Sequence, residues 1–368
     1  MNGDPYSFEF KIKELQQLPY HITNNHHFNQ VYQSYYNCFT AFRRISQIKT
    51  LEENQRFCTF IRNVLDDHLV VLPHLMMGSL EISMLQSLEP SRLDEFMSSM
   101  IKSRVSRRVI MNQHISMSKS FSESQYSPTD EMTKPPDYIG DSFQYCSPHS
   151  HIRTSYDLII RFMQSVYPTL PMPELILAGD DVKFQFLTNH LDYIITEILR
   201  NSLKATIENF IQNNNGNQKP PPVTVEITSS KEEIAFRFSD QGGGIPFELT
   251  ESVWSFAKTP ELAQVYLKNL HDLSDVDLQR RPRILEKDLL ENEALNETDN
   301  IENTILNNIG QMELSGDEDD RSILKALASR PFESKLGISL PLCRVYTDYW
   351  NGILEWSSVE GYGSDVFL

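Results

Sequence analysis

Long stretches with helical periodicity fill the first half of this sequence and constrain its fold more than any other feature. Four segments, residues 11–22, 28–46, 51–83 and 91–118, repeat apolar residues at spacings of three and four, which is the pattern of helices with one apolar face. Only one glycine, Gly78, falls within them. Because each such helix must bury its apolar face against another, these segments predict a helical bundle.

The second half of the chain has a different pattern. A further helix is expected over residues 190–212, and residues 223–230 and 232–240 alternate apolar and polar side chains with the period of a β-hairpin. After a long polar region, a helical pattern returns at 336–350, and a second alternating stretch follows at 352–368 around a Gly-Tyr-Gly turn. This order predicts an α/β sandwich in which helices cover one face of a mixed or antiparallel sheet.

Together the two halves predict an α+β protein with two domains, since 368 residues exceed what one core usually holds. We expect a four-helix-bundle-like domain over residues 1–168 and the α/β sandwich over 169–368, with the proline-containing segment TLPMPEL as the seam between them. Residues 119–150 are rich in Ser, Pro, Tyr and Asp and are expected to form a surface loop.

A polar insertion of about residues 262–333 interrupts the second domain. Its portion from Glu286 to Asp320 holds twelve acidic residues and one lysine. Such a composition, with few aromatic residues, is typical of a solvated and disordered segment. The alternative is an acidic element that repels or selects partners. We expect this insertion to form a lid over a neighbouring site.

Composition counts against several functional classes. A formal net charge of −17 argues against broad nucleic-acid binding, and no run of the sequence reaches the roughly 18 apolar residues that span a bilayer. The four cysteines lack the spacing of a metal site and are typical of reduced thiols in an intracellular compartment. The N-terminal sequence MNGDPYSFEF has the features of neither a signal peptide nor a transit peptide.

Polar residues one turn apart on the expected helix 190–212 are candidates for chemistry. Glu197 and Asn201 share a face with Lys204 and Glu208, while the apolar residues of the helix lie on the other side. An asparagine oxygen is a ligand that Mg²⁺ accepts, and a glutamate can take a proton from an attacking hydroxyl or water. The alternative is that these side chains only decorate a solvated helix face.

Three consecutive glycines come two positions after Asp240, the aspartate that ends the second strand of the first expected hairpin. The carboxylate of Asp240 can accept a hydrogen bond from an exocyclic amine, and Gly242, Gly243 and Gly244 leave room for a flat base against the backbone. A tight turn is the competing explanation, but a turn needs only one or two glycines. The run therefore favours the close approach of a planar ligand.

The order of these motifs resembles the ATP-binding fold shared by gyrase, the heat-shock chaperones, mismatch-repair ATPases and histidine kinases. The order is Glu-x-x-x-Asn on a helix, then Asp-x-Gly-Gly-Gly, a long lid, and a glycine-bearing helix start. Within that fold the chain is most similar to the mitochondrial 2-oxoacid dehydrogenase kinases, which include the pyruvate and branched-chain members. The similarity covers nearly the whole chain, through segments such as SRVSRRVIMNQH, HLDYIITEILRNSLKATIE, FSDQGGGIP and LPLCRVYTDYWNGILEWSSVEGYGSDVFL.

The resemblance implies a role for each candidate residue. Glu197 would act as the general base on a serine hydroxyl, Asn201 would hold Mg²⁺ against the phosphates of ATP, and Asp240 would recognise the adenine amine. The other residues that the resemblance places around ATP are Arg200, Lys204, Gly242, Gly244, Gly337, Leu340 and Ser364.

The sequence departs from the family pattern at two places near these residues. Where the family has Gly-aromatic-Gly-x-Gly-Leu-Pro, this chain keeps only Gly337 and has Lys335 and Ser339 in place of the other glycines. Side chains there are expected to crowd or redirect the amides that surround the phosphates. Tyr193 stands where pyruvate-directed members often have a histidine, and it cannot tune a carboxylate as an imidazole does. Weak or altered catalysis is therefore one expectation.

The resemblance implies an ATP-dependent protein-serine kinase of the mitochondrial matrix. Such a kinase phosphorylates and inactivates the decarboxylase α subunit of the pyruvate dehydrogenase complex, docks on lipoyl domains of the complex core, and forms a homodimer through its C-terminal sheet. The branched-chain 2-oxoacid dehydrogenase complex is the alternative substrate. The alternatives of another class are an ATP-driven conformational ATPase and a scaffold with weak catalysis.

Overall fold

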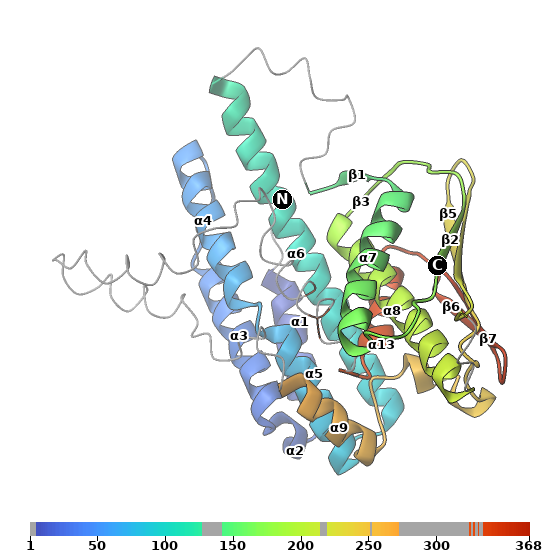
Figure 1. The fold of residues 1–368 in the computed structure, drawn as a ribbon. Coiled ribbons are helices and arrows are strands. Elements are labelled where there is room, and N and C mark those ends of the chain that lie inside the picture. Colours follow the sequence, from blue (N-terminus) through green and yellow to red (C-terminus); the bar gives the residue numbers. More distant parts are fainter. Residues whose placement is uncertain are drawn as a thin grey trace.

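The protein folds into a helical region that stands beside a five-stranded sheet, and α8 (Thr188–Gln212) and α13 (Ser339–Tyr349) lie between the two (Figure 1). This arrangement confirms the predicted α+β fold class, with helices first and a mixed sheet after them. The structure is a computed structural model, and the residues it describes are 5–126, 142–213, 219–250, 252–271, 324, 327, 330 and 334–368.

The helical region comprises α1 to α6, and side-chain caps explain where some of these helices begin. Thr50 and Glu53 form a reciprocal capping box at the start of one helix, and Asn25 accepts hydrogen bonds from the amides of His27 and Phe28 at the start of another. The bounds are Pro5–Gln16 (α1), Tyr20–Thr23 (α2), His26–Arg43 (α3), Leu51–Asp67 (α4), Val71–Leu85 (α5) and Pro90–Tyr126 (α6).

The stretch Leu51–Leu85 is long and apolar enough to cross a membrane by length and composition alone. In the structure it is divided into α4 and α5, and 78% of its most apolar window is buried. Helix α5 contacts both α3 and α6, and its Leu72, Leu75 and Met77 belong to the hydrophobic core. Packing inside the helical region therefore accounts for the apolar character of this stretch.

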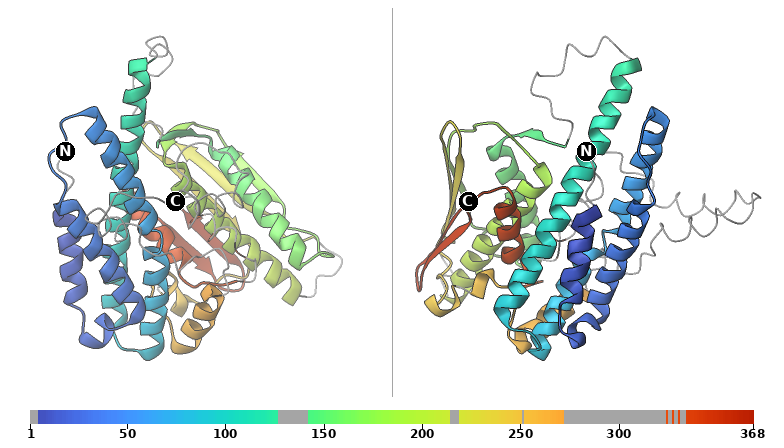
Figure 2. Two further views of the ribbon diagram at one scale, coloured as in Figure 1. Left: turned by 90° about the vertical axis from the view of Figure 1, so that its left-hand side faces the viewer. Right: turned by 180° about the vertical axis from the view of Figure 1, so that it is seen from behind.

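The sheet has the strand order β2-β4-β5-β7-β6, in which β2 pairs parallel with β4 and the other pairs are antiparallel. The two predicted hairpins form β4–β5 and β6–β7. Helices α7, α8 and α13 lie on the face of the sheet that is turned toward the helical region (Figures 1 and 2). The bounds are Pro148–Val166 (α7), Leu175–Gly179 (β2), Thr188–Gln212 (α8), Val223–Ser229 (β4), Ile234–Asp240 (β5), Ser339–Tyr349 (α13), Glu355–Val359 (β6) and Gly363–Phe367 (β7).

The segment 119–150, expected to be a surface loop, differs from that expectation at both ends. Helix α6 continues to Tyr126, because no proline interrupts it until Pro128. Near the other end, β1 (Gln144–Cys146) pairs antiparallel with β3 (Phe184–Phe186). Residues 127–141 lie outside the described residues. A three-residue strand carries too little alternation to be recognised from its sequence.

The predicted lid insertion, about residues 262–333, begins as an ordered helix. Residues 262–271 belong to α9 (Pro260–His271), which packs against α5 and buries Ala263 and Leu270. The acidic portion Glu286–Asp320 lies outside the described residues. The division into domains at residue 168 stays a prediction; α7, which precedes that boundary, packs against α8.

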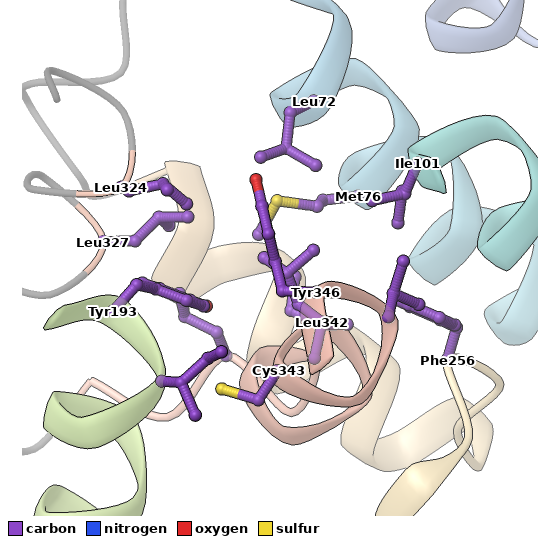
Figure 3. Close-up of a cluster of buried hydrophobic side chains, with 14 of the residues drawn as sticks. Leu72, Met76, Ile101, Tyr193, Phe256, Leu324, Leu327, Leu342, Cys343 and Tyr346 are labelled. Carbon is purple, nitrogen blue, oxygen red and sulfur yellow. The ribbon is translucent and has the colours of Figure 1, made fainter. Parts of the chain in front are cut away.

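One hydrophobic core runs through the helical region and the sheet region without interruption. Figure 3 shows its centre, where Tyr346 and Leu342 of α13 lie among Leu72 and Met76 of α5 and Ile101 of α6. Hydrogen bonds connect the two regions as well. The Asp94 carboxylate on α6 accepts from the backbone amides of Phe256, at 2.6 Å, and of Ala257, at 3.3 Å, after the short helices η2 (Phe247–Leu249) and η3 (Ser252–Trp254).

Helices α3 and α5 approach closely at a glycine. A Cβ atom added to Gly78 would lie 2.7 Å from Cε1 of Phe28, whose ring is buried. We expect Gly78→Ala to lower the free energy of unfolding by about 1–2 kcal/mol, because overpacking outweighs the better helix propensity of alanine.

Urea unfolding would measure this loss, with Gln55→Ala on the exposed face of α4 as a control that shifts the free energy by less than about 0.5 kcal/mol. Combining Gly78→Ala with Phe28→Leu should recover part of the loss. Wild-type stability in Gly78→Ala alone would show that the ring does not limit the approach of the two helices.

Candidate functional site

A cavity of about 1390 Å³ opens where α8, the start of α13 and the connection between α5 and α6 meet. Its walls come from both regions of the chain, since Ser83 and Asp94 line it together with residues of the sheet and of α8. Most of the site residues predicted from the sequence lie on these walls. They are Arg200, Asn201, Lys204, Asp240, Gly244, Gly337, Leu340 and Ser364.

A buried carboxylate lies at the sheet end of the cavity. Asp240 pairs with Ser364 across β5 and β7, so the two predicted residues are neighbours although 124 positions separate them in the sequence. Burial raises the pKa of Asp240, and its Oδ1 accepts a hydrogen bond of 2.9 Å from the amide of Gly242. A carboxylate in this setting can accept a further hydrogen bond from a ligand that carries an amine.

The glycine run makes close backbone contacts as well as lining the cavity. Gly244 lines it with a φ of +65°, and a Cβ there would lie 2.3 Å from the carbonyl oxygen of Val359. Gly242 is not among the cavity-lining residues; a Cβ on it would lie 2.4 Å from the Cβ of Ala205 on α8. Close packing against α8 and against the β6–β7 turn therefore requires glycine at both positions.

Cationic side chains stand on the wall of the cavity that α8 forms. Burial, together with the nearby Lys335, lowers the pKa of Lys204 to about 8, and burial beside Arg330 lowers the pKa of Arg200 to about 10. The Asn201 amide nitrogen donates to the Glu197 carbonyl at 2.8 Å, so its oxygen is the atom with acceptor capacity toward the cavity. The α8 wall of the cavity is therefore suited to an anion accompanied by a hard cation.

The predicted base Glu197 is not among the cavity-lining residues. Its side chain is 0% exposed, and its two oxygens accept hydrogen bonds from Nη1 and Nη2 of Arg330, with 2.8 Å between Nη2 and Oε2. Burial alone would raise the pKa of Glu197, but Arg330, together with Arg200 and Ser339, outweighs it and holds the pKa below its usual value. Arg330 and Ser339 line the cavity, so the carboxylate lies behind them.

Sequence reasoning identified Ser339 as a departure but missed its partner. The Ser339 hydroxyl accepts from Nη2 of Arg330 at 3.3 Å and lies close enough to Glu197 to lower its pKa. Arg330 falls within the insertion that the composition assigned to a disordered lid, so nothing in the local sequence pointed to it. The other departure, Tyr193, is buried near Glu197, and burial raises its pKa well above the usual value.

Comparisons with known proteins show which family this chain resembles. A family model described as mitochondrial branched-chain alpha-ketoacid dehydrogenase kinase matches residues 5–141. The [pyruvate dehydrogenase (acetyl-transferring)] kinase 2, mitochondrial, of Saccharomyces cerevisiae is 36% identical over an alignment that covers 97% of this chain and 73% of that protein.

The chain belongs to the mitochondrial 2-oxoacid dehydrogenase kinase family. More distant relatives have similar coverage. A pyruvate dehydrogenase kinase isozyme 4 from Ictidomys tridecemlineatus is 22% identical and covers 97% of this chain and 71% of its own length. A pyruvate dehydrogenase kinase from Arabidopsis thaliana is 24% identical, and the alignment covers 96% of this chain and 78% of that protein. Membership of the 2-oxoacid dehydrogenase kinase family confirms the resemblance found in the sequence motifs.

The one glycine that this family member keeps before α13 has a structural reason. Gly337 has a φ of +70°, and a Cβ on it would lie 2.2 Å from Cε2 of Tyr266 on α9. Gly361 has a similar φ of +80° but has no atom within 4 Å of an added Cβ.

We expect Gly361→Ala to lower the free energy of unfolding by about 1–2 kcal/mol, from left-handed strain alone. Gly337→Ala should lose about 1–3 kcal/mol more, because the ring of Tyr266 must move. Chemical unfolding of the two variants side by side measures the difference. Equal losses would show that the contact with Tyr266 does not restrict this position.

Proposed function

We propose that this chain is an ATP-dependent protein-serine kinase of the mitochondrial matrix, which phosphorylates and inactivates the decarboxylase α subunit of the pyruvate dehydrogenase complex. One observation carries the proposal: a single cavity is lined by a buried carboxylate, Asp240, and by Asn201 with the cations of Arg200 and Lys204. The family membership supports it, because the relatives described above are named as pyruvate dehydrogenase kinases.

The residues of the cavity fit ATP. Asp240 would accept a hydrogen bond from the exocyclic amine of adenine, with Ser364 beside it. Arg200 and Lys204 would neutralise the phosphates, together with the amides at the start of α13. Phosphoryl transfer asks the protein mainly for positioning and charge neutralisation, which this set of residues can supply.

The cavity also fits Mg²⁺ at Asn201. An amide oxygen is a ligand that this cation takes alongside waters and phosphate oxygens, and the Asn201 nitrogen is already engaged by the Glu197 carbonyl. When bound, the ion would neutralise phosphate charge. Among the described residues, no group of three or more His, Cys, Asp or Glu side chains is arranged so that it could hold a metal ion, so a site formed by protein ligands alone is not the arrangement proposed.

Glu197 would take the proton of the substrate serine hydroxyl. A carboxylate that serves as a base must come within hydrogen-bond distance of that hydroxyl, about 3 Å. In this structure both of its oxygens accept from Arg330. The proposed reaction therefore requires that the guanidinium leave the carboxylate before a hydroxyl reaches it.

Two alternatives each have one observation in their favour. The family model that matches residues 5–141 is described as a branched-chain alpha-ketoacid dehydrogenase kinase, which favours the branched-chain complex as a second candidate substrate. The burial of Glu197 behind Arg330 favours a scaffold with weak catalysis. An ATP-driven ATPase would use the same carboxylate on water.

Partners follow from the same proposal. Lipoyl domains of the complex core would be the docking partners, and the C-terminal sheet would form the homodimer contact. Apolar side chains exposed near and on β6 and β7 support a contact there: Ile353, Val359 and Phe367 are 71%, 64% and 40% exposed.

Labelled ATP tests the function directly. Incubated with each purified dehydrogenase complex, the wild-type protein should label a serine of the pyruvate dehydrogenase decarboxylase and inactivate it. Glu197→Gln should lower the rate by about 10²–10⁴-fold, because a positioned base contributes that much. Glu226→Gln, on the exposed surface of β4, is the control that keeps the wild-type rate.

Other outcomes of this experiment separate the candidates. Label on the branched-chain decarboxylase alone would replace the proposed substrate by the second one. Phosphate release without label on any protein would support the ATPase. If Glu197→Gln affected neither reaction, the scaffold with weak catalysis would be the remaining candidate.

Asp240→Asn tests the adenine end of the cavity. We expect ATP and ADP to lose affinity by the same factor, about ten- to hundredfold, because a hydrogen bond to a charged group contributes about 1.5–3 kcal/mol and both nucleotides carry the amine. Calorimetric titration measures both affinities. Asp365→Asn, on the next strand and paired with Arg237, is the matched control. Unchanged affinity for both nucleotides in Asp240→Asn would show that adenine does not bind at Asp240.

A further inference from the structure

The Glu197–Arg330 pair is buried more completely than the other arginine–carboxylate pairs recorded among the described residues. Its side chains are 0% and 4% exposed, whereas the pairs formed by Arg56 and Arg237 lie at the surface. Burying two charges is costly and is tolerated only where geometry is good and the remaining donors are satisfied. The position of this pair therefore calls for a functional explanation.

The guanidinium of Arg330 is held from every side. Nη1 donates to the carbonyl of Leu327 at 2.5 Å, Nε donates to the carbonyl of Ser334 at 3.1 Å, and Nη2 donates to the Ser339 hydroxyl in addition to Glu197. Each nitrogen thus has a partner. Such a set of acceptors uses the five N–H donors of the guanidinium, whose planar geometry suits bidentate binding of a carboxylate or a phosphate.

Buried apolar residues anchor the chain just before Arg330. Leu324 and Leu327 are 2% and 1% exposed, and Figure 3 shows them in the cluster that contains Leu72, Met76 and Tyr346. Arg330 lines the cavity three residues after the second of these leucines. A change of its partner needs rotation of the side chain and leaves the leucine anchors in place.

The place that Arg330 occupies is the place that the proposed reaction needs. The substrate hydroxyl must lie about 3 Å from the Glu197 carboxylate, and the terminal phosphoryl group must lie next to that hydroxyl for an in-line transfer. Arg330 lines the cavity beside Arg200, Lys204 and Ser339. A terminal phosphate that reached the substrate hydroxyl would thus meet the guanidinium, and a guanidinium binds phosphate as it binds carboxylate.

We propose that Arg330 is a latch that exchanges partners: it covers Glu197 when no terminal phosphate is present, and it turns to the γ-phosphate when ATP binds, which exposes the base. The proposal rests on the proposed function, because it takes Glu197 as the base. It adds a residue that binds the third phosphate and a reason why ADP, which lacks that phosphate, leaves the base covered.

The exchange has a thermodynamic consequence. Glu197 and the γ-phosphate compete for one guanidinium, so the carboxylate must weaken the binding of ATP and leave the binding of ADP unchanged. Removing the negative charge of Glu197 releases Arg330 to the phosphate. Removing Arg330 takes away the advantage of ATP over ADP.

Calorimetric titration of the full chain with MgATP and with MgADP tests the latch. We expect Glu197→Gln to bind ATP about tenfold more tightly than wild type, and ADP within about twofold, in the range usual for coupled sites. Arg330→Gln should lower the ratio of ATP to ADP affinity by about tenfold. The double variant should show the same ratio as Arg330→Gln, because no charge competes any longer. Arg237→Gln, which removes a surface pair, is the matched control and should keep the wild-type ratio.

The outcomes decide between the latch and its absence. Glu197→Gln that weakens ATP, or shifts ATP and ADP alike, overturns the proposal. Glu197→Gln leaves Arg330 buried without a carboxylate and can fail to fold for that reason. In that case the double variant, which has two neutral amides, decides. A wild-type ratio of ATP to ADP affinity in the double variant also overturns the proposal. Failure of the wild type to bind either nucleotide overturns the latch and the proposed function together. The expected ratios without label on any complex would support the latch and overturn only the kinase assignment.

Discussion

Helix α8 imposes the constraint on which the rest of the site depends. It must bury apolar residues against the sheet and against α7, and it must also present Asn201 and Lys204 to the cavity on its remaining side. Both requirements are met because residues three and four positions apart share a face. The sheet fixes the other wall, since the pairing of β5 with β7 brings Asp240 and Ser364 together. Two walls that differ in chemistry are thus set by ordinary packing.

The sequence was sufficient for the elements with clear periodicity. The helix with Glu197 and Asn201, and both hairpins, form where they were expected, because an apolar stripe or an alternation is a local signal. Strand β2 was missed, since a parallel strand is recognised only with its partner β4, which lies more than forty residues later. The break between α4 and α5 was also missed. No glycine marks it, and the two helices on either side of it both pack against α6.

The part of the site that could not be predicted is its charge pairing. Glu197 was expected to face the cavity, but whether a carboxylate is open or paired depends on residues far away in the sequence, here 133 positions. Arg330 carries no local signal, because it lies within a polar insertion in which one more charged residue is unremarkable. The glycine-to-serine departure at Ser339 was visible, yet its role appears only when the Arg330 guanidinium lies against it. Hydrogen-bonded networks between segments far apart in the sequence cannot be predicted from the periodicity of either segment.

The hydrogen bonds of Asp94 have a mechanical consequence. Its carboxylate holds the amides of Phe256 and Ala257 to α6, and the Ser83 hydroxyl on α5 holds the amide of Lys258 in the same way. A rim of the cavity is thereby hydrogen-bonded to both helices, and the far end of α6, a helix of 37 residues, stands well away from it (Figure 1). Because α6 is one continuous helix, a tilt at its distant end would be carried along its length to the residues that hold this rim.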